Sequence, residues 1–559
     1  MTAVTAMAFD DTPDGAAAAT TINSLLSPPA PALLRADNPR AEATWEFPID
    51  NEAGTEALAH LLAEELRPGD LVTLSGDLGA GKTTFARALI RILADDPDLE
   101  VPSPTFTLMQ LYETVHGTVV HADLYRVGSA AELEDLGWDE ASEEAIVLVE
   151  WPERAAGVLA ADRLDVALTH VNSDNYEARR VRLTGTGHFA PRLARLQSLR
   201  RLLEKAGWGE ARREHIYGDA SVRLYDRLHK PTGETAILMI APPRLAGPAI
   251  RNGRPYHELA KLADRVDAFV AVAQGLREQG FSAPEIYGAD LDQGLVLVED
   301  LGQEPVVNAD GPIPERYREA VGVLAALHDK DLPSVLPVMD GREHVLQPYD
   351  LEALLIEVEL LLDWYAPHQG GGSLGAAARS DFLKIWTELL GQVVNGPQTD
   401  IAQTSIPQTW TLRDMHSPNL FWLPRREGLA RVGLIDLQDT VLGHPAYDVA
   451  ALLQDARVTV PAALELELIA HYAKLRRARH PDFDVAGFAE AYAILGAQRI
   501  TKLFGTFVRL DKRDGKPQYL AHLPRLQDYL ARNLAHPVLS ELKLWYEARL
   551  PGLVAQTSA

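Results

Sequence analysis

Two stretches of this 559-residue chain have the residue pattern of phosphoryl-transfer sites, and they lie far apart in the sequence. The first, SGDLGAGKTTFARAL, begins at Ser75, and the second, LRDMHSPNLFWL, begins at Leu412. One chain rarely needs two such sites for one reaction, and a chain of this length fits two to four domains. The sequence therefore predicts at least two domains with separate chemistry.

Composition narrows the class of protein. Hydrophobic residues make up 47% of the chain and charged residues 24%, which is typical of a globular protein in water. The net charge of -26 argues against a general affinity for nucleic acid or for an anionic membrane. Because the chain has no cysteine, disulfides, thiolate metal sites and cysteine nucleophiles are excluded. Neither a membrane-spanning stretch nor a signal-peptide pattern is present, so we expect a cytoplasmic protein.

The order of apolar runs predicts three regions. Residues 1–40, rich in Ala, Thr and Pro, are expected to be a disordered leader. Residues 41–188 alternate strand and helix patterns, which predicts an α/β P-loop NTPase domain with a mostly parallel sheet. Residues 189–559 begin with a helix, continue with strands and become mostly helical, which predicts a two-lobed α+β kinase-like domain.

The first motif satisfies GxxxxGK[ST] and lies between a buried strand pattern and a helix. Its glycines let backbone N–H groups turn toward phosphate oxygens, at the positive end of the following helix. Lys82 would reach the β- and γ-phosphates of ATP, and Thr83 would hold Mg²⁺. The predicted phosphate loop consists of Gly76, Asp77, Gly79, Ala80, Gly81, Lys82, Thr83 and Thr84.

A phosphate loop also needs an acidic partner for the metal at the end of a buried strand. Asp123 ends the run VVHAD, and Glu150 ends AIVLVE. Either residue alone is more often a plain strand-end carboxylate, but two in the same half favour a function.

Four motifs in this half, GDLGAGKTTF, SPTFTL, HADLYR and LVEWPERA, resemble the TsaE family over about residues 45–185. This family comprises small ATPases of bacterial tRNA threonylcarbamoyladenosine synthesis. The resemblance implies that Thr83 and Glu150 bind Mg²⁺, that Glu150 serves catalysis, and that Asp123 lies at the nucleotide. It also implies a switch-like loop that senses the γ-phosphate, and contacts near the base or phosphate edge. The loop residues are Ser103 and Thr105, and the edge residues are Glu52 and Arg179.

Proteins of this kind act with partner proteins, one of which carries the transferase site, and ATP hydrolysis resets the complex. The resemblance therefore implies tRNA-modification partner proteins and only indirect contact with tRNA.

The second motif combines Asp414 and Asn419, five residues apart, with Asp436 after a short apolar strand. This is the D-x-x-x-x-N and metal-binding Asp pattern of kinase-like sites. Asp414 would take the proton of the acceptor hydroxyl or only orient that hydroxyl. Asn419 and Asp436 would hold Mg²⁺ between them and the phosphates of ATP.

The strands upstream fit the small lobe of a kinase. YGDASVRLYDRL places Gly218 and Ser221 in a turn suited to cover phosphates, and LVLVEDLG, with Glu299, resembles the hinge that meets adenine. One departure concerns Met239, which stands where protein kinases carry a strand lysine; Arg223 is a candidate replacement.

This half resembles the aminoglycoside phosphotransferase superfamily over about residues 200–550. Within this superfamily, its motifs are most similar to those of the AmgK family. These motifs are GDAS, ILMIAPP, LVEDLG, LRDMHSPNLFWLP and IDLQDTVLGHPAYDVAALLQDAR. Those enzymes are anomeric kinases of N-acetylmuramate and N-acetylglucosamine in cell-wall recycling. The usual His of the catalytic loop is Leu412 here, as the AmgK pattern permits.

The leading interpretation is a bifunctional fusion that uses ATP and Mg²⁺ in both halves and an amino sugar in the second. A first alternative is an antibiotic or choline kinase with an accessory ATPase. A second is a pseudokinase scaffold for tRNA-modification partners. The missing strand lysine favours the scaffold, whereas the intact Asp414, Asn419 and Asp436 argue against it.

Overall fold

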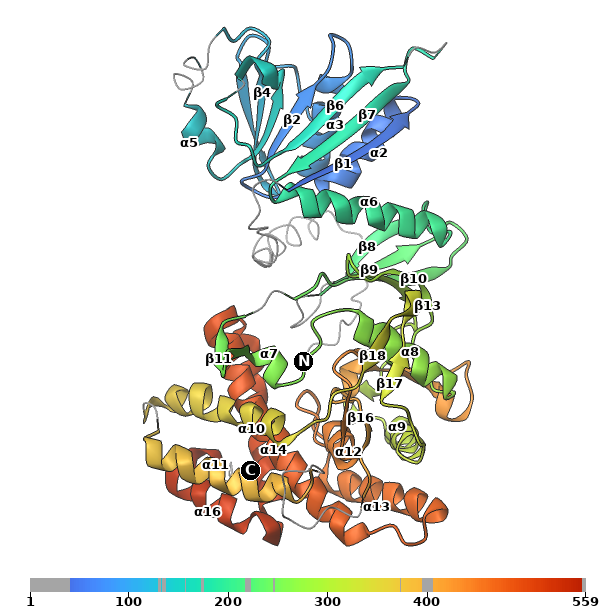
Figure 1. The fold of residues 1–559 in the computed structure, drawn as a ribbon, viewed down its shortest axis with the longest axis vertical. Helices are drawn as coiled ribbons and strands as arrows, with labels where there is room; N and C mark the ends of the chain where they lie inside the picture. Colours follow the sequence, from blue (N-terminus) through green and yellow to red (C-terminus); the bar gives the residue numbers. More distant parts are fainter. Residues whose placement is uncertain are drawn as a thin grey trace. The chain divides into compact units, whose positions relative to one another are not determined.

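A computed structural model describes residues 41–128, 132, 137–155, 157–171, 175–216, 223–244, 247–371, 374–394 and 406–554. The predicted leader, residues 1–40, lies outside this description. The chain divides into two compact units between Lys205 and Ala206. In Figure 1 the first unit is coloured from blue to teal and the second from green to red.

A seven-stranded sheet forms the centre of the first unit, in the order β1-β7-β6-β2-β5-β4-β3. The strands β4, β5, β2 and β6 are parallel neighbours, while β3, β7 and β1 are added antiparallel at the two edges. The strand bounds are β1 Glu42–Ile49, β2 Leu71–Ser75, β3 Met109–Thr114, β4 Gly117–Asp123, β5 Ile146–Glu150, β6 Leu164–His170 and β7 Arg179–Thr186.

Apolar side chains cover both faces of this sheet. Along β5, Ile146 and Leu148 face one core and Val147 and Val149 face another, because successive strand residues point to opposite faces. The helices α2 (Glu52–Ala63) and α3 (Lys82–Ala94) contribute to the first core, and Trp138 of α5 (Trp138–Ser142) to the second (Figure 1). This covered parallel sheet is the predicted α/β architecture.

The helix α6 (Phe189–Lys205) belongs to the first unit, although the sequence placed it at the start of the second domain. Leu193 and Leu196 pack into the same core as α2 and α3. The guanidinium of Arg192 donates to both carboxylate oxygens of Asp70, at 3.0 and 2.9 Å, and both residues are buried. The structure therefore moves the division from after residue 188 to after Lys205.

The second unit begins with an antiparallel five-stranded sheet, in the order β13-β14-β10-β9-β8, and α8 (Asp267–Glu278) lies against it. Leu295–Glu299 (β14) ends at the hinge into the larger lobe. The other strands are β8 Arg212–Ile216, β9 Leu224–His229, β10 Thr235–Ile240 and β13 Ile286–Asp290.

The larger lobe is mostly helical and shares one apolar core with the small lobe, which confirms the predicted two-lobed α+β organisation. Its longest helix, α14, begins after Asp484, whose side chain accepts from Gly487 N, and ends at Gly515 in the left-handed conformation. Two small antiparallel strand pairs, β19–β22 and β20–β21, flank the second motif. The main bounds are α9 Pro314–Leu327, α10 Leu351–Leu360, α11 Ala376–Gly391, α12 Ala446–Leu453, α13 Ala462–Arg479, α14 Val485–Asp514, α15 Leu523–Leu534, α16 Ser540–Arg549, β19 Thr409–Thr411, β20 Leu420–Trp422, β21 Val432–Leu434 and β22 Val441–Gly443.

Within the described ranges, no helix combines the length and the apolar character that crossing a membrane requires.

A buried ionic cluster joins two helices of the larger lobe to the loop after β19. Glu357 of α10 has no exposed surface and accepts from Arg413 Nη2 at 2.5 Å and from Lys502 Nζ of α14 at 2.7 Å. Tyr349 OH and Gln498 Nε2 donate to its second oxygen, at 2.5 and 3.0 Å. Burial alone would raise the pKa of Glu357, but Lys502 and Arg413 lower it, and the net shift of its pKa is downward.

We predict that Glu357→Ala destabilises the larger lobe by about 3–5 kcal/mol, because Arg413 and Lys502 would keep buried charges without their carboxylate. Hydrogen exchange of peptides from α10 and α14 measures the change, and peptides from β2 and β5 should keep their protection. Glu388→Ala is the control, since Glu388 and Lys384 form an exposed pair at 3.9 Å and its loss should cost less than about 1 kcal/mol. Equal stability of the two variants would contradict the assigned role of the cluster.

Candidate active sites

The phosphate loop connects β2 to α3 and is shaped by three glycines with positive φ, Gly76, Gly79 and Gly81. A Cβ at Gly76 would lie 2.2 Å from the backbone oxygen of Leu168, so only glycine fits there. The φ of Gly81 is 104°, and α3 begins at the next residue. The predicted loop is therefore built, with its backbone at the N-terminus of a helix.

Lys82 lies inside the loop with a side chain that is largely buried. Its Nζ donates to the backbone oxygens of Gly76 at 2.8 Å and Asp77 at 3.0 Å, and lies 3.6 Å from the ring centroid of Trp151. Burial lowers the pKa of Lys82, and the carboxylate of Glu150 partly offsets this shift. Trp151, with a φ of 61°, was not predicted as a site residue.

The two predicted acids lie side by side, because Asp123 of β4 pairs with Glu150 of β5 in the parallel register. Thr83 Oγ1 donates to Glu150 Oε2 at 2.9 Å, which brings the two expected metal ligands together. Asp123 Oδ2 accepts from Ser103 Oγ at 2.7 Å and from Thr105 Oγ1 at 3.1 Å. The expected switch-like loop is thus joined to the strand-end acid.

His121 is a site residue that the sequence analysis missed. Its Nε2 lies 3.0 Å from Glu150 Oε1, and both side chains are buried. His121 stands two residues before Asp123, so the two side chains lie on the same side of β4. That alternation within VVHAD was the signal available in the sequence.

The two edge residues differ in their contacts. Arg179, at the start of β7, donates from Nε to the backbone oxygen of Ala80 at 3.0 Å and from Nη2 to that of Gly79 at 3.5 Å. Glu52 begins α2 and its side chain is exposed. Ile49 pairs with Arg179 in the sheet, so the chain reaches Glu52 from the same edge of the sheet.

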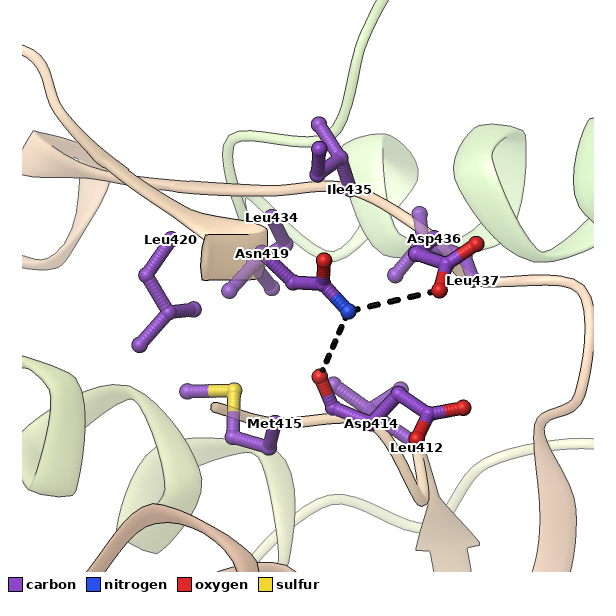
Figure 2. A pocket seen from close by; sticks show the side chains of 9 residues that line it. All are labelled: Leu412, Asp414, Met415, Asn419, Leu420, Leu434, Ile435, Asp436 and Leu437. Carbon is purple, nitrogen blue, oxygen red and sulfur yellow. Dashed lines mark hydrogen bonds between the residues drawn. The ribbon is translucent and has the colours of Figure 1, made fainter. Parts of the chain in front are cut away.

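In the second unit, Asp414, Asn419 and Asp436 converge on one small pocket between the hairpin strands (Figure 2). Asn419 Nδ2 donates to the backbone oxygen of Asp414 at 3.0 Å and lies 3.4 Å from Asp436 Oδ2. Asp414 and Asp436 keep 38% and 32% of their side chains exposed, which leaves both carboxylates accessible to a ligand. The predicted trio is therefore assembled.

Two buried aspartates hold the backbone of this catalytic loop. Asp448 of α12 accepts from the backbone N–H groups of Leu412 at 2.6 Å and Arg413 at 2.8 Å. Burial raises the pKa of Asp448 to about 7, although these two donors lower it. Asp455 accepts from the N–H of Ser417 at 2.8 Å and from its hydroxyl at 2.5 Å. The loop therefore keeps its shape through hydrogen bonds from its own backbone.

Arg413, directly before Asp414, has a φ of 66°, which is uncommon for a residue with a side chain. Its guanidinium also donates to the backbone oxygens of Ala260 at 3.0 Å and Lys261 at 3.1 Å. These contacts and the one with Glu357 tie the loop to the rest of the unit through the side chain of Arg413, in addition to the backbone contacts with Asp448. The sequence analysis did not identify Arg413, Glu357, Lys502, Asp448 or Asp455 as site residues.

The small lobe supplies the other predicted positions. Glu299 ends β14, where its carboxylate is engaged by Arg426 and by Arg277 Nη1, the latter at 3.4 Å. The side chain of Glu299 therefore joins α8 of the small lobe to Arg426 of the larger lobe, and the predicted contact of this hinge with adenine stays a prediction. Met239 is buried, and Arg223 Nη1 lies 3.6 Å from Asp436 Oδ1. Gly218 and Ser221 lie outside the described residues.

Both sites offer the oxygen donors that Mg²⁺ prefers: a carboxylate and a hydroxyl in the first unit, a carboxylate and an amide in the second. In the second unit Asn419 Nδ2 faces both the backbone oxygen of Asp414 and Asp436 Oδ2, and the amide oxygen points away from both (Figure 2). Among the residues described here, no cluster of three or more His, Asp or Glu has the geometry of a metal site. Any bound Mg²⁺ would therefore take further ligands from the phosphates or water.

Two known protein families match separate parts of the chain. Residues 49–181 match the family described as threonylcarbamoyl adenosine biosynthesis protein TsaE. Residues 212–483 match the phosphotransferase enzyme family. The two matches do not overlap, and each falls within one structural unit.

Individual relatives agree with this division. The N-acetylmuramate/N-acetylglucosamine kinase of Caulobacter vibrioides is 39% identical over 362 residues, covering 62% of this chain and 95% of the relative. The enzyme of the same name from Pseudomonas aeruginosa is 28% identical, covering 60% of this chain and 89% of its own. The tRNA threonylcarbamoyladenosine biosynthesis protein TsaE of Rickettsia felis is 42% identical over 120 residues, covering 22% of this chain and 70% of its own. The chain therefore belongs to the TsaE family through its first unit and to the N-acetylmuramate/N-acetylglucosamine kinase family through its second.

Proposed function

We propose that this chain is a bifunctional enzyme. Its first unit is an ATPase that supports threonylcarbamoyladenosine modification of tRNA. Its second unit is an ATP-dependent kinase for the anomeric hydroxyl of N-acetylmuramate or N-acetylglucosamine. The observation that carries this proposal is that each unit brings its own candidate phosphoryl-transfer residues together: Thr83 with Glu150 in the first unit, and Asn419 with Asp436 and the backbone of Asp414 in the second.

In the first unit, the loop N–H groups and Lys82 would bind the phosphates of ATP, and Thr83 and Glu150 would hold Mg²⁺. Mg²⁺ supplies charge neutralisation on the phosphates when it is bound. His121 fixes the orientation of Glu150 through the hydrogen bond at 3.0 Å. The hydroxyls of Ser103 and Thr105 donate hydrogen bonds to Asp123. A shift of the loop that contains Ser103 and Thr105 would therefore signal to Asp123 that the γ-phosphate is bound.

The proposed partners of the first unit are the proteins of the threonylcarbamoyl-transferase complex, with tRNA bound by those partners. ATP hydrolysis would reset that complex. A cytoplasmic location, where tRNA and ATP are both available, belongs to the same proposal.

In the second unit, Asp414 would accept the proton of the anomeric hydroxyl or hold that hydroxyl in line with the γ-phosphate. An anomeric hydroxyl is more acidic than other sugar hydroxyls, so a carboxylate is a sufficient base. Asn419 and Asp436 would hold Mg²⁺, and the anchored loop keeps Asp414 at a fixed distance from them. This fixed geometry favours catalysis over a pseudokinase scaffold, which would not need it.

For the first unit, we predict that the full-length chain restores threonylcarbamoyladenosine in the tRNA of a bacterium depleted of its own TsaE, when the cognate partner proteins are supplied. Glu150→Ala should not restore it, because Thr83 and His121 would lose their common carboxylate and Mg²⁺ a ligand. Mass spectrometry of digested tRNA measures the nucleoside.

The matched control is Glu144→Ala, an exposed acid just before β5, which should restore the modification. Failure of the intact chain, or equal rescue by Glu150→Ala, would contradict the assignment.

For the second unit, we predict that the product is a sugar 1-phosphate, recognised in phosphorus NMR by its coupling to the anomeric proton. Asp414→Asn should lower turnover by roughly two or more orders of magnitude while ATP still binds. Asp436→Ala should instead weaken the binding of Mg²⁺-ATP. Asp381→Asn, at an exposed position of α11, is the control and should leave turnover unchanged. A 6-phosphate product, or activity only on aminoglycosides or choline, would overturn the sugar assignment.

A further inference from the structure

The ion pair by which kinases hold ATP phosphates is absent from its usual place. That pair joins a lysine on the third strand to a glutamate on the following helix. Here the strand position is Met239, which is 2% exposed in the core. Two helices follow this strand: α7 (Tyr256–Leu259) carries Glu258, and α8 carries Asp267, which accepts from Arg265 and Arg342, and the exposed Glu278. The lysine of the usual pair is therefore replaced.

On the sheet face where the kinase lysine would stand, the neighbouring strand carries a polar side chain, Tyr225. Met239 pairs with Tyr225 on one side and with Val296 on the other, so these three side chains lie on the same face. Burial raises the pKa of Tyr225 to about 12, the nearby Asp436 raises it as well, and a hydrogen bond with Arg223 lowers it. This face of the small lobe therefore looks toward Asp436.

Arg223 stands two residues before Tyr225, and its side chain also reaches Asp436. Its Nη1 lies 3.6 Å from Asp436 Oδ1, a contact too long for a good hydrogen bond. Gln438 Nε2 donates to the same oxygen at 2.7 Å. Arg223 is thus held beside the proposed metal ligand, and its guanidinium has donors enough to bind a phosphate as well.

We propose that Arg223 binds the phosphates of ATP in the second unit, in the place of the strand lysine. This inference rests on the proposed kinase function and adds to it the residue that carries the positive charge. A guanidinium can donate two parallel hydrogen bonds to phosphate oxygens, and it stays charged beside a buried sheet face. The position of Asp436 fits this role, since Mg²⁺ held there would bridge the same phosphates.

The test compares ligands with and without phosphates in the full-length chain. The KM for ATP is measured from sugar 1-phosphate formation, so that the first unit does not contribute to the signal. Competitive inhibition by ADP and by adenosine is measured in the same assay. The variants are Arg223→Gln, Arg223→Lys and the control Arg212→Gln, an exposed arginine on the edge strand β8 of the same sheet.

Arg223→Gln should raise the KM for ATP and the inhibition constant of ADP about ten- to hundredfold, the scale of a hydrogen bond to a charged group. The inhibition constant of adenosine and the KM for the sugar should stay within about twofold of the wild type. Arg223→Lys should recover most of the loss, and Arg212→Gln should behave as the wild type.

An unchanged KM for ATP and an unchanged ADP constant in Arg223→Gln would overturn the proposal. Equal weakening of ADP and adenosine would also overturn it, because the role would then be structural. A wild-type chain that phosphorylates no sugar would instead overturn the proposed function, and the two failures are distinguishable by this result.

Discussion

Buried carboxylates that accept several hydrogen bonds hold the phosphate-handling loops of both units. Glu150 joins the phosphate-loop Thr83 to His121, while Asp448 holds the backbone of the catalytic loop at Leu412 and Arg413. Such groups are costly to bury unless their partners are complete, so each one fixes its neighbours in a single arrangement. The geometry of both sites therefore depends on these contacts.

This dependence explains what could be predicted from the sequence. The strand-loop-helix context of Lys82 and the spacing of Asp414 and Asn419 are local signals, and both sites are assembled as those signals indicated. The sequence also showed that Asp123 and Glu150 each end an apolar run, while their pairing on neighbouring strands is a finding of the structure.

The contacts that were missed are long-range. Glu357 and Lys502 lie on different helices. The residue pattern of neither helix indicates that Glu357 is buried and accepts hydrogen bonds from both Lys502 and Arg413. The helix α6 was placed in the wrong unit for a related reason: its apolar spacing predicts a buried face but not the core that covers it. The ion pair of Arg192 with Asp70 and the packing of Leu193 assign α6 to the first unit, and both contacts are visible only in the folded structure.

We propose that the two units bind nucleotide independently, each through its own residues. Calorimetric titration of the full-length chain with a non-hydrolysable ATP analogue and Mg²⁺ measures the number of sites. We expect two nucleotides bound per chain, with Lys82→Ala removing one of them and Asp436→Ala the other. Binding of a single nucleotide by the wild type, or loss of both from either variant, would contradict it.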